Sequence, residues 1–132
     1  MQRTILFPLL AGAMVLGACV PQEQAGQADF DAYCAACHGS DARGNGPVSV
    51  DLNLNAPDLT LIAQRNGGEF PFTQVMSTID GYARADQHGS VMPEFGPLLD
   101  GPTVLVEYEG GIQTPTPEPL VSLAHYLESI QR

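Results

Sequence analysis

The chain has 132 residues, a length that corresponds to one ordinary domain and leaves room for a short extra segment. Its mean hydropathy is near zero and 15% of its residues are charged, which is typical of a globular protein rather than a disordered or fibrous one. Five Arg and no Lys face fifteen carboxylates, giving a formal net charge of −10. This acidity argues against nucleic acid as a partner, because nucleic-acid binding depends on clustered cations.

Residues 1–18 are typical of an export signal. Arg3 precedes an apolar run over residues 5–16, which is too short to span a bilayer comfortably. The run ends in Leu-Gly-Ala-Cys at residues 16–19, which resembles the lipobox of bacterial lipoproteins. We therefore expect cleavage before Cys19 and attachment of lipid to its sulfur. The alternative is an ordinary secretory signal whose cleavage site adjoins a cysteine, and either cleavage removes Arg3 and leaves an acidic mature chain.

The start of the folded domain is predicted near Asp29. Residues 19–28 are small and polar without apolar periodicity, so they predict a flexible tether, and the domain is expected over residues 29–132. Asp29 can cap a helix that begins there. One face of that helix carries Phe30, Tyr33, Cys34 and Cys37. Because the cysteines share this face, it should contact whatever they bind.

The middle of the chain predicts loops and two short helices. Residues 39–56 contain several Gly, Asn and Asp and predict a loop with tight turns. A helix is expected to begin at Pro57 and to end at residues 66–68, where Asn-Gly-Gly supplies left-handed residues. Its apolar stripe consists of Leu59, Ile62 and Ala63. A second helix is predicted over residues 72–80, before a long loop to about residue 102.

The C-terminal part predicts a hairpin and then a helix. Residues 104–113 combine β-branched side chains with paired glycines and predict a small β-hairpin, although two strands alone are marginally stable. Thr116 is expected to cap the last helix, with Pro117 in its first turn. The apolar stripe of that helix consists of Leu120, Leu123, Ala124, Leu127 and Ile130. These patterns predict a mainly α domain.

The chemistry of the chain is concentrated in Cys-Ala-Ala-Cys-His at residues 34–38. Thiols three positions apart can each add to one vinyl group of a single haem, and His38 is then placed beneath the iron. This is the attachment motif of c-type cytochromes, which the sequence resembles here. A zinc site would need a second Cys pair, and a thioredoxin-like pair would need a preceding strand. A structural disulfide or dithiol between Cys34 and Cys37 is the remaining alternative.

The sixth coordination position of the iron decides function, because a protein ligand there makes an electron carrier and an open position makes a gas binder or catalyst. Met76 lies on an apolar stripe and is expected in the core, whereas His125 lies opposite the leucine stripe and is expected in solvent. Met92 is favoured, because Pro93 stiffens the loop that presents its thioether. His88, four residues earlier, is the second candidate.

Residues 92–96, Met-Pro-Glu-Phe-Gly, resemble the ligand loop of monohaem class I c-type cytochromes. The resemblance covers about residues 29–130 and implies four short helices and long loops around one covalent haem c. It implies that the first and last helices cross, with Phe30 against Leu123, Tyr126 or Leu127. It also implies that a loop proline carbonyl, expected at Pro47, accepts the proton of the second ring nitrogen of His38.

The function expected from this resemblance is one-electron transfer with His38 and Met92 as axial ligands, without catalytic activity of its own. The cofactor is expected to be one haem c held by Cys34 and Cys37. Three further side chains are expected to neutralise the haem propionates, namely Tyr82, Arg65 and Arg84. Two alternatives stay open: a haem subunit of a larger oxidoreductase complex, and a gas-binding sensor with a labile sixth ligand.

The expected location is the periplasmic side of a bacterial membrane, with the chain held by lipid on Cys19. Redox proteins such as a dehydrogenase, reductase or oxidase are the expected partners. Because the mature chain is acidic, the docking face of the partner should be basic or largely apolar.

Overall fold

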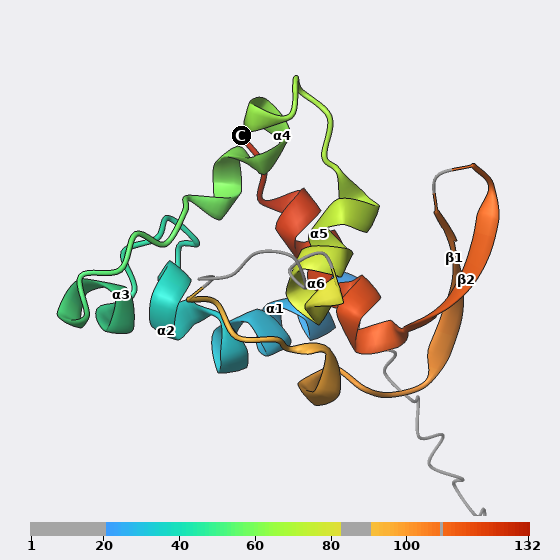
Figure 1. Cartoon of the computed structure of the whole chain (residues 1–132), viewed down its shortest axis with the longest axis horizontal. Helices are drawn as coiled ribbons and strands as arrows, with labels where there is room; N and C mark the ends of the chain where they lie inside the picture. The colour runs from blue at the N-terminus through green and yellow to red at the C-terminus, as the bar shows by residue number, and fades with distance from the viewer. Residues whose placement is uncertain (1–20, 83–90, 109) are drawn as a thin grey trace, which may run out of the picture.

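The computed structural model describes residues 21–82, 91–108 and 110–132. Sequence predictions on the signal segment, Cys19, Arg84 and His88 fall outside these residues. Within them the chain is mainly helical with one small antiparallel sheet (Figure 1), as the sequence predicted. None of the helices in this part of the chain is both long and apolar enough to cross a bilayer.

The N-terminal half contains α1 (Gln22–Tyr33), α2 (Ala35–His38), α3 (Pro47–Asp51), η1 (Leu59–Leu61), α4 (Ile62–Arg65) and α5 (Phe72–Asp80). The C-terminal half contains η3 (Gly96–Leu98), β1 (Thr103–Tyr108), β2 (Ile112–Pro117) and α6 (Glu118–Ser129). Helix α1 crosses α6 at the centre of the domain, and the hairpin projects from one side (Figure 1).

The crossing of α1 and α6 depends on Gly26. This glycine is buried, and a Cβ atom added to it would overlap the backbone carbonyl of Ser122 in α6. Beyond this close approach the ring of Phe30 packs on Tyr126, with centroids 5.4 Å apart, which confirms the predicted contact of first and last helices. Two helix backbones can approach this closely only where no side chain separates them.

Helix α1 corrects the predicted start of the domain. It begins at Gln22 after Pro21, not at Asp29, so most of the segment predicted as a tether forms the first turns of a packed helix. The sequence signal is weak because this half of the helix is small and polar, and its order comes from contact with α6. The helix also ends at Tyr33, and Cys34 lies between it and α2 instead of inside one continuous helix.

Two other predictions for the N-terminal half differ from the structure. The predicted loop over residues 39–56 contains α3, which starts at Pro47. The helix predicted after Pro57 is divided into η1 and α4, with the side chain of Asp58 accepting a hydrogen bond of 2.9 Å from the amide of Thr60. Its predicted end holds, because Gly67 and Gly68 have positive φ angles of 75° and 98°. The prediction for residues 72–80 is confirmed by α5.

The hairpin is longer than the sequence predicted, since β2 continues through Pro117. Thr116 pairs with Val104 in the sheet and does not cap α6, which begins at Glu118. Pro115 and Pro117 weakened the strand signal, because proline lacks a ladder donor. A two-stranded sheet tolerates both, since each strand has one edge without a partner strand.

The core lies between α1, α5 and α6. Its largest fully buried side chains are Phe30, Met76, Leu99 and Leu123. Met76 is therefore a core residue, as its place on an apolar stripe predicted. Helix α5 packs against α6, and its buried residues Val75 and Ile79 also line a cavity.

Candidate functional site

The cysteine motif begins at Cys34, between α1 and α2, and continues through the single turn of α2. The amide of Cys34 donates to the carbonyl of Phe30, and the amide of His38 donates to the carbonyl of Cys34, each over 2.9 Å. Cys34 and His38 are buried, and Cys37 is half-buried. This turn brings both thiols and the imidazole to the same part of the molecule.

Two adjoining cavities open beside this turn, with volumes of about 350 and about 400 Å³. Volumes of about 300–1,000 Å³ are usual for cofactor and small-molecule sites. Both cavities are bounded by Cys34, His38, Pro57 and Met92. The first extends between α1, α5 and the segment 57–66, and the second extends toward Tyr33 and Phe95. Their walls are mainly apolar, so a flat, largely apolar group fits between them.

The imidazole of His38 is oriented by Pro57. Its Nδ1 lies 3.2 Å from the carbonyl oxygen of Pro57, to which the Nδ1 proton is donated. The prediction that Pro47 supplies this carbonyl was wrong, because the carbonyl beside Nδ1 is that of Pro57, while Pro47 begins α3. Burial lowers the pKa of His38, and the hydrogen bond to Pro57 acts in the opposite direction. A neutral imidazole with Nδ1 protonated leaves Nε2 as the nitrogen able to bind a metal.

Glycines bring Pro57 to this position. Gly44 has a positive φ of 83°, and a Cβ atom added there would overlap the carbonyl of Ala56, next to Pro57. The amide of Gly44 donates to the carbonyl of His38 over 2.7 Å. The segment before Pro57 therefore touches the backbone of the loop that follows the motif, and no larger residue at position 44 would permit this contact.

The Cys34 thiol is buried in the apolar cluster that borders the cavities. Burial raises its pKa to about 11, with smaller contributions from Asp29 and Cys37. A reactive redox thiol has a lowered pKa instead, because it acts as a thiolate. Among the described residues, no three His, Cys, Asp or Glu side chains are grouped so that they could hold a metal ion.

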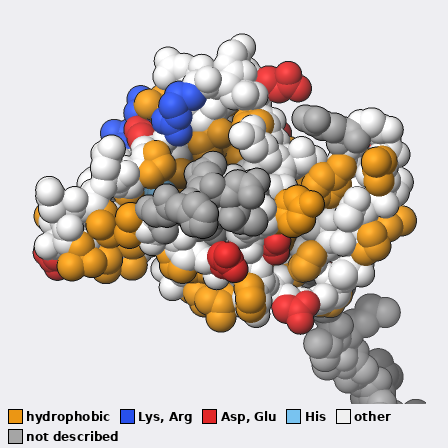
Figure 2. All heavy atoms as spheres, viewed as in Figure 1, with side chains coloured by type: hydrophobic (Ala, Val, Ile, Leu, Met, Phe, Trp, Pro, Cys, Tyr) orange, Lys and Arg blue, Asp and Glu red, His pale blue; other side chains and the backbone are white. Residues whose placement is uncertain are grey.

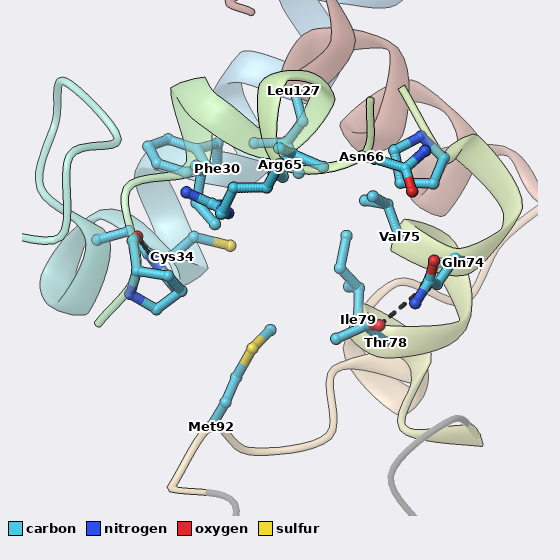
Figure 3. A pocket seen from close by; sticks show the side chains of 15 residues that line it. Phe30, Cys34, Arg65, Asn66, Gln74, Val75, Thr78, Ile79, Met92 and Leu127 are labelled. Carbon is cyan, nitrogen blue, oxygen red and sulfur yellow. Dashed lines mark hydrogen bonds between the residues drawn. The ribbon is translucent and has the colours of Figure 1, made fainter. Parts of the chain in front are cut away.

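Met92 lies on the far side of the first cavity from the motif. Figure 3 shows its side chain and the sulfur of Cys34 directed toward the same space from two separate segments. The loop after Met92 is held against α5, because the amide of Phe95 donates to the carbonyl of Ile79 over 3.0 Å. Gly96 also lies against Asp80, where a Cβ atom would overlap the carboxylate. The loop predicted to present a thioether is thus anchored in position.

Of the other residues considered in the sequence analysis, Arg65 lies at the first cavity and Tyr82 does not. Arg65 lines the first cavity, and its guanidinium donates to the backbone carbonyl of Asp58 over 2.8 Å. Tyr82 is 83% exposed and lines neither cavity. The ring of His125 lies against that of Phe72, with centroids 4.6 Å apart and the planes tilted by 49°, so His125 is half-buried and not fully in solvent as predicted.

Sequence reasoning missed the role of the segment 57–65. Pro57 was predicted only to begin a helix, yet its carbonyl orients His38. Leu59 and Ile62 were predicted as a helix stripe, and they line the first cavity. A backbone carbonyl leaves no signal in residue type, so spacing alone could not distinguish Pro57 from Pro47.

The arrangement fits a covalent haem. It offers two thiols on one turn, an imidazole whose Nδ1–H is hydrogen-bonded to Pro57, a facing thioether, apolar walls and one guanidinium at the cavity wall.

The sequence model of the cytochrome c family matches residues 23–131. No curated protein sequence matches the chain. The match spans the two crossing helices, the cysteine motif and the methionine loop, and the chain therefore belongs to the cytochrome c family, whose cofactor is covalently bound haem c and whose chemistry is haem-based electron transfer.

Proposed function

We propose that this chain is a one-electron carrier in which haem c is attached through Cys34 and Cys37 and the iron is ligated by His38 and Met92. The observation that supports this most strongly is that a buried imidazole and a loop thioether line the same pair of cavities. A family member with two permanent protein ligands keeps its coordination when the oxidation state changes, which is what rapid electron transfer requires.

When bound, haem c supplies an iron that gains or loses one electron. For its attachment, Cys34 and Cys37 would each add S–H across one vinyl C=C bond, forming a C–S and a C–H bond with no leaving group. His38 donates its Nδ1–H to the carbonyl of Pro57, which leaves Nε2 available to the iron. The thioether of Met92 favours the ferrous state more than a second imidazole would. Apolar side chains around both cavities exclude water.

We further propose that the chain has no catalytic activity of its own. Ligation of the iron by both His38 and Met92 would leave no coordination position for a substrate. A gas-binding sensor would instead require Met92 to dissociate readily. Carbon monoxide binding to the intact protein would therefore contradict this part of the proposal.

We expect the double substitution Cys34→Ala and Cys37→Ala to abolish covalent haem attachment, because both thioether bonds are lost. The measurement is the mass of the mature protein, with haem extractability by acid-acetone as a second readout. Ala36→Ser is the matched control, since Ala36 is exposed between the two cysteines and the control keeps both thiols. Extraction of haem from the unaltered protein by acid-acetone would contradict the assignment.

We expect Met92→Ala to retain covalent haem, to lose the weak near-red band of Met-ligated ferric haem and to gain carbon monoxide binding. Visible spectra with a carbon monoxide titration measure both changes. Met76→Leu is the control, because Met76 is fully buried in the core and this change should leave the band in place. If the spectrum of Met92→Ala is unchanged, the sixth ligand is another residue.

We propose that lipid on Cys19 holds the domain at the periplasmic face of a membrane. The structure begins its first helix at Gln22, only three residues after Cys19. An extended chain advances at most about 3.5 Å per residue, so the backbone of Gln22 would lie within about 10 Å of the backbone of Cys19, whose sulfur carries the lipid. Such a short connection would restrict how the domain turns relative to the membrane.

We expect Cys19→Ala to prevent lipidation and to release the protein from the membrane fraction, because the thiol is the group that carries the acyl chains. Fractionation followed by a salt wash, with mass spectrometry of the N-terminal peptide, measures the outcome. Wild-type recovery in the washed membrane fraction would rule out the anchor.

We propose that the redox partner docks with an apolar surface bordered by basic groups. Tyr33 and Val91 line the second cavity and are 40% and 69% exposed. Val50 on α3 and Leu52 just after it are 67% and 65% exposed. Figure 2 shows hydrophobic side chains gathered over this end of the molecule. With a formal net charge of −10 before any cleavage, the chain would repel an acidic partner.

We expect the association rate with this partner to fall as ionic strength rises, because salt shortens the Debye length from roughly 30 to roughly 8 Å and weakens steering by opposite charge. Stopped-flow measurement of electron transfer over this range is the test. A rate that stays flat would eliminate the basic border and leave apolar docking alone.

A further inference from the structure

Gln131 attaches the region after α6 to the segment 57–65. Its side-chain Oε1 accepts from the amide of Ala63 over 2.9 Å. Its Nε2 donates to the carbonyl of Leu59 over 2.9 Å and to the carbonyl of Leu127, in α6, over 2.6 Å. One carboxamide therefore uses three hydrogen bonds to join α6, η1 and α4.

Arg132 makes a second connection to the same segment. Its amide donates to the carbonyl of Thr60 over 3.1 Å, and its Nε donates to the hydroxyl of Thr60 over 2.8 Å. Its Nη2 forms an ion pair with the carboxylate of Asp58 over 3.1 Å. The Thr60 hydroxyl holds the pKa of Asp58 below its ordinary value, and Arg132 adds to this, so Asp58 stays charged at neutral pH.

The segment they hold carries the groups that surround His38. The carbonyl of Pro57 accepts from His38 Nδ1, and Leu59 and Ile62 line the first cavity. On its other side the segment is tied to the motif loop by one backbone bond of 2.8 Å, from the amide of Leu59 to the carbonyl of Ala42.

This segment has little rigidity of its own. Its helices η1 and α4 contain three and four residues, too few to be stable without outside contacts. The hydrogen bonds from Gln131 and Arg132 are therefore a substantial part of what fixes the position of Pro57.

We propose that Gln131 and Arg132 are positioning residues that hold the segment 57–65 against α6 and thereby set the strength of the His38–Pro57 hydrogen bond, and through it the reduction potential. The proposal rests on the proposed ligation by His38. A strong hydrogen bond to Nδ1 makes the imidazole more basic and favours the ferric state. Loosening the segment should therefore weaken that bond and raise the potential.

The test uses the haem-loaded protein with ¹⁵N-labelled histidine, in the ferrous state. The chain has three histidines, so the ring proton of His38 can be assigned, and ring-current shifts identify it as the haem ligand. Gln131→Met removes the three side-chain hydrogen bonds at similar length, and Arg132→Gln removes the ion pair but keeps the backbone bond. Arg132→Lys tests rescue by a cation. The readouts are solvent exchange of the His38 Nδ1 proton and the potential from a redox titration.

Each control makes the same kind of substitution at a residue that takes no part in these hydrogen bonds to the segment 57–65. Arg43→Gln removes the same charge from an exposed arginine paired with Asp41, and Gln24→Met makes the same exchange on the exposed side of α1. Amide exchange at the α1–α6 contact, for example at Leu123 and Ala124, reports global stability.

We expect Gln131→Met and Arg132→Gln to accelerate exchange of the His38 ring proton by roughly five- to thirtyfold, the effect of losing one or two net hydrogen bonds. The potential should rise in both variants, Arg132→Lys should restore part of the change, and both controls should behave as the unaltered protein.

Unchanged exchange and potential, with His and Met ligation intact, would overturn the positioning role alone. Equal acceleration at Leu123 and Ala124 would also overturn it, because the residues would then stabilise the whole domain. Absence of ring-current shifts at His38 in the unaltered protein would instead overturn the proposed ligation.

Discussion

The close contact of α1 and α6 at Gly26 is the constraint on which the rest of the structure depends. Because α1 ends at the cysteine motif, its crossing with α6 fixes where Cys34 and His38 lie relative to Leu127. The same crossing directs the residues after α6 toward the segment 57–65. A side chain at position 26 would separate the helices, and both ends of the site would move with them.

The site is built mainly from short elements that backbone hydrogen bonds hold in place. The carbonyl of Pro57 orients His38, and Gly44 permits the approach that brings this carbonyl close. The methionine loop is tied to α5 by the amide of Phe95 in a similar way. Short elements of this kind gain stability from what they surround, and in this family they surround a haem that serves as part of the core.

Much of this could be predicted from sequence because the signals are local. Helix α5 was predicted over its full length by its apolar stripe and by Gly81, which has a φ of 106°. Residues 34–38 predicted covalent haem, and the family match confirms that cofactor. The contact of Phe30 with Tyr126 followed from the family resemblance and is present. The predicted ligand pair places His38 and Met92 at shared cavities, while their bonds to iron stay a prediction.

The sequence by itself determined the class of the domain and its cofactor, and it predicted which residues bear the chemistry, because thiol spacing, loop proline and helix periodicity are properties of neighbouring residues. Only the tertiary structure decided that α1 begins at Gln22, that Thr116 belongs to a strand and that Pro57 rather than Pro47 faces His38. Each of these depends on contact between segments distant in the chain: a helix ordered by packing, a proline tolerated at a free strand edge, and a carbonyl that any residue could offer. The types of the side chains at these positions do not reveal such contacts, so these three features were decided by the tertiary structure alone.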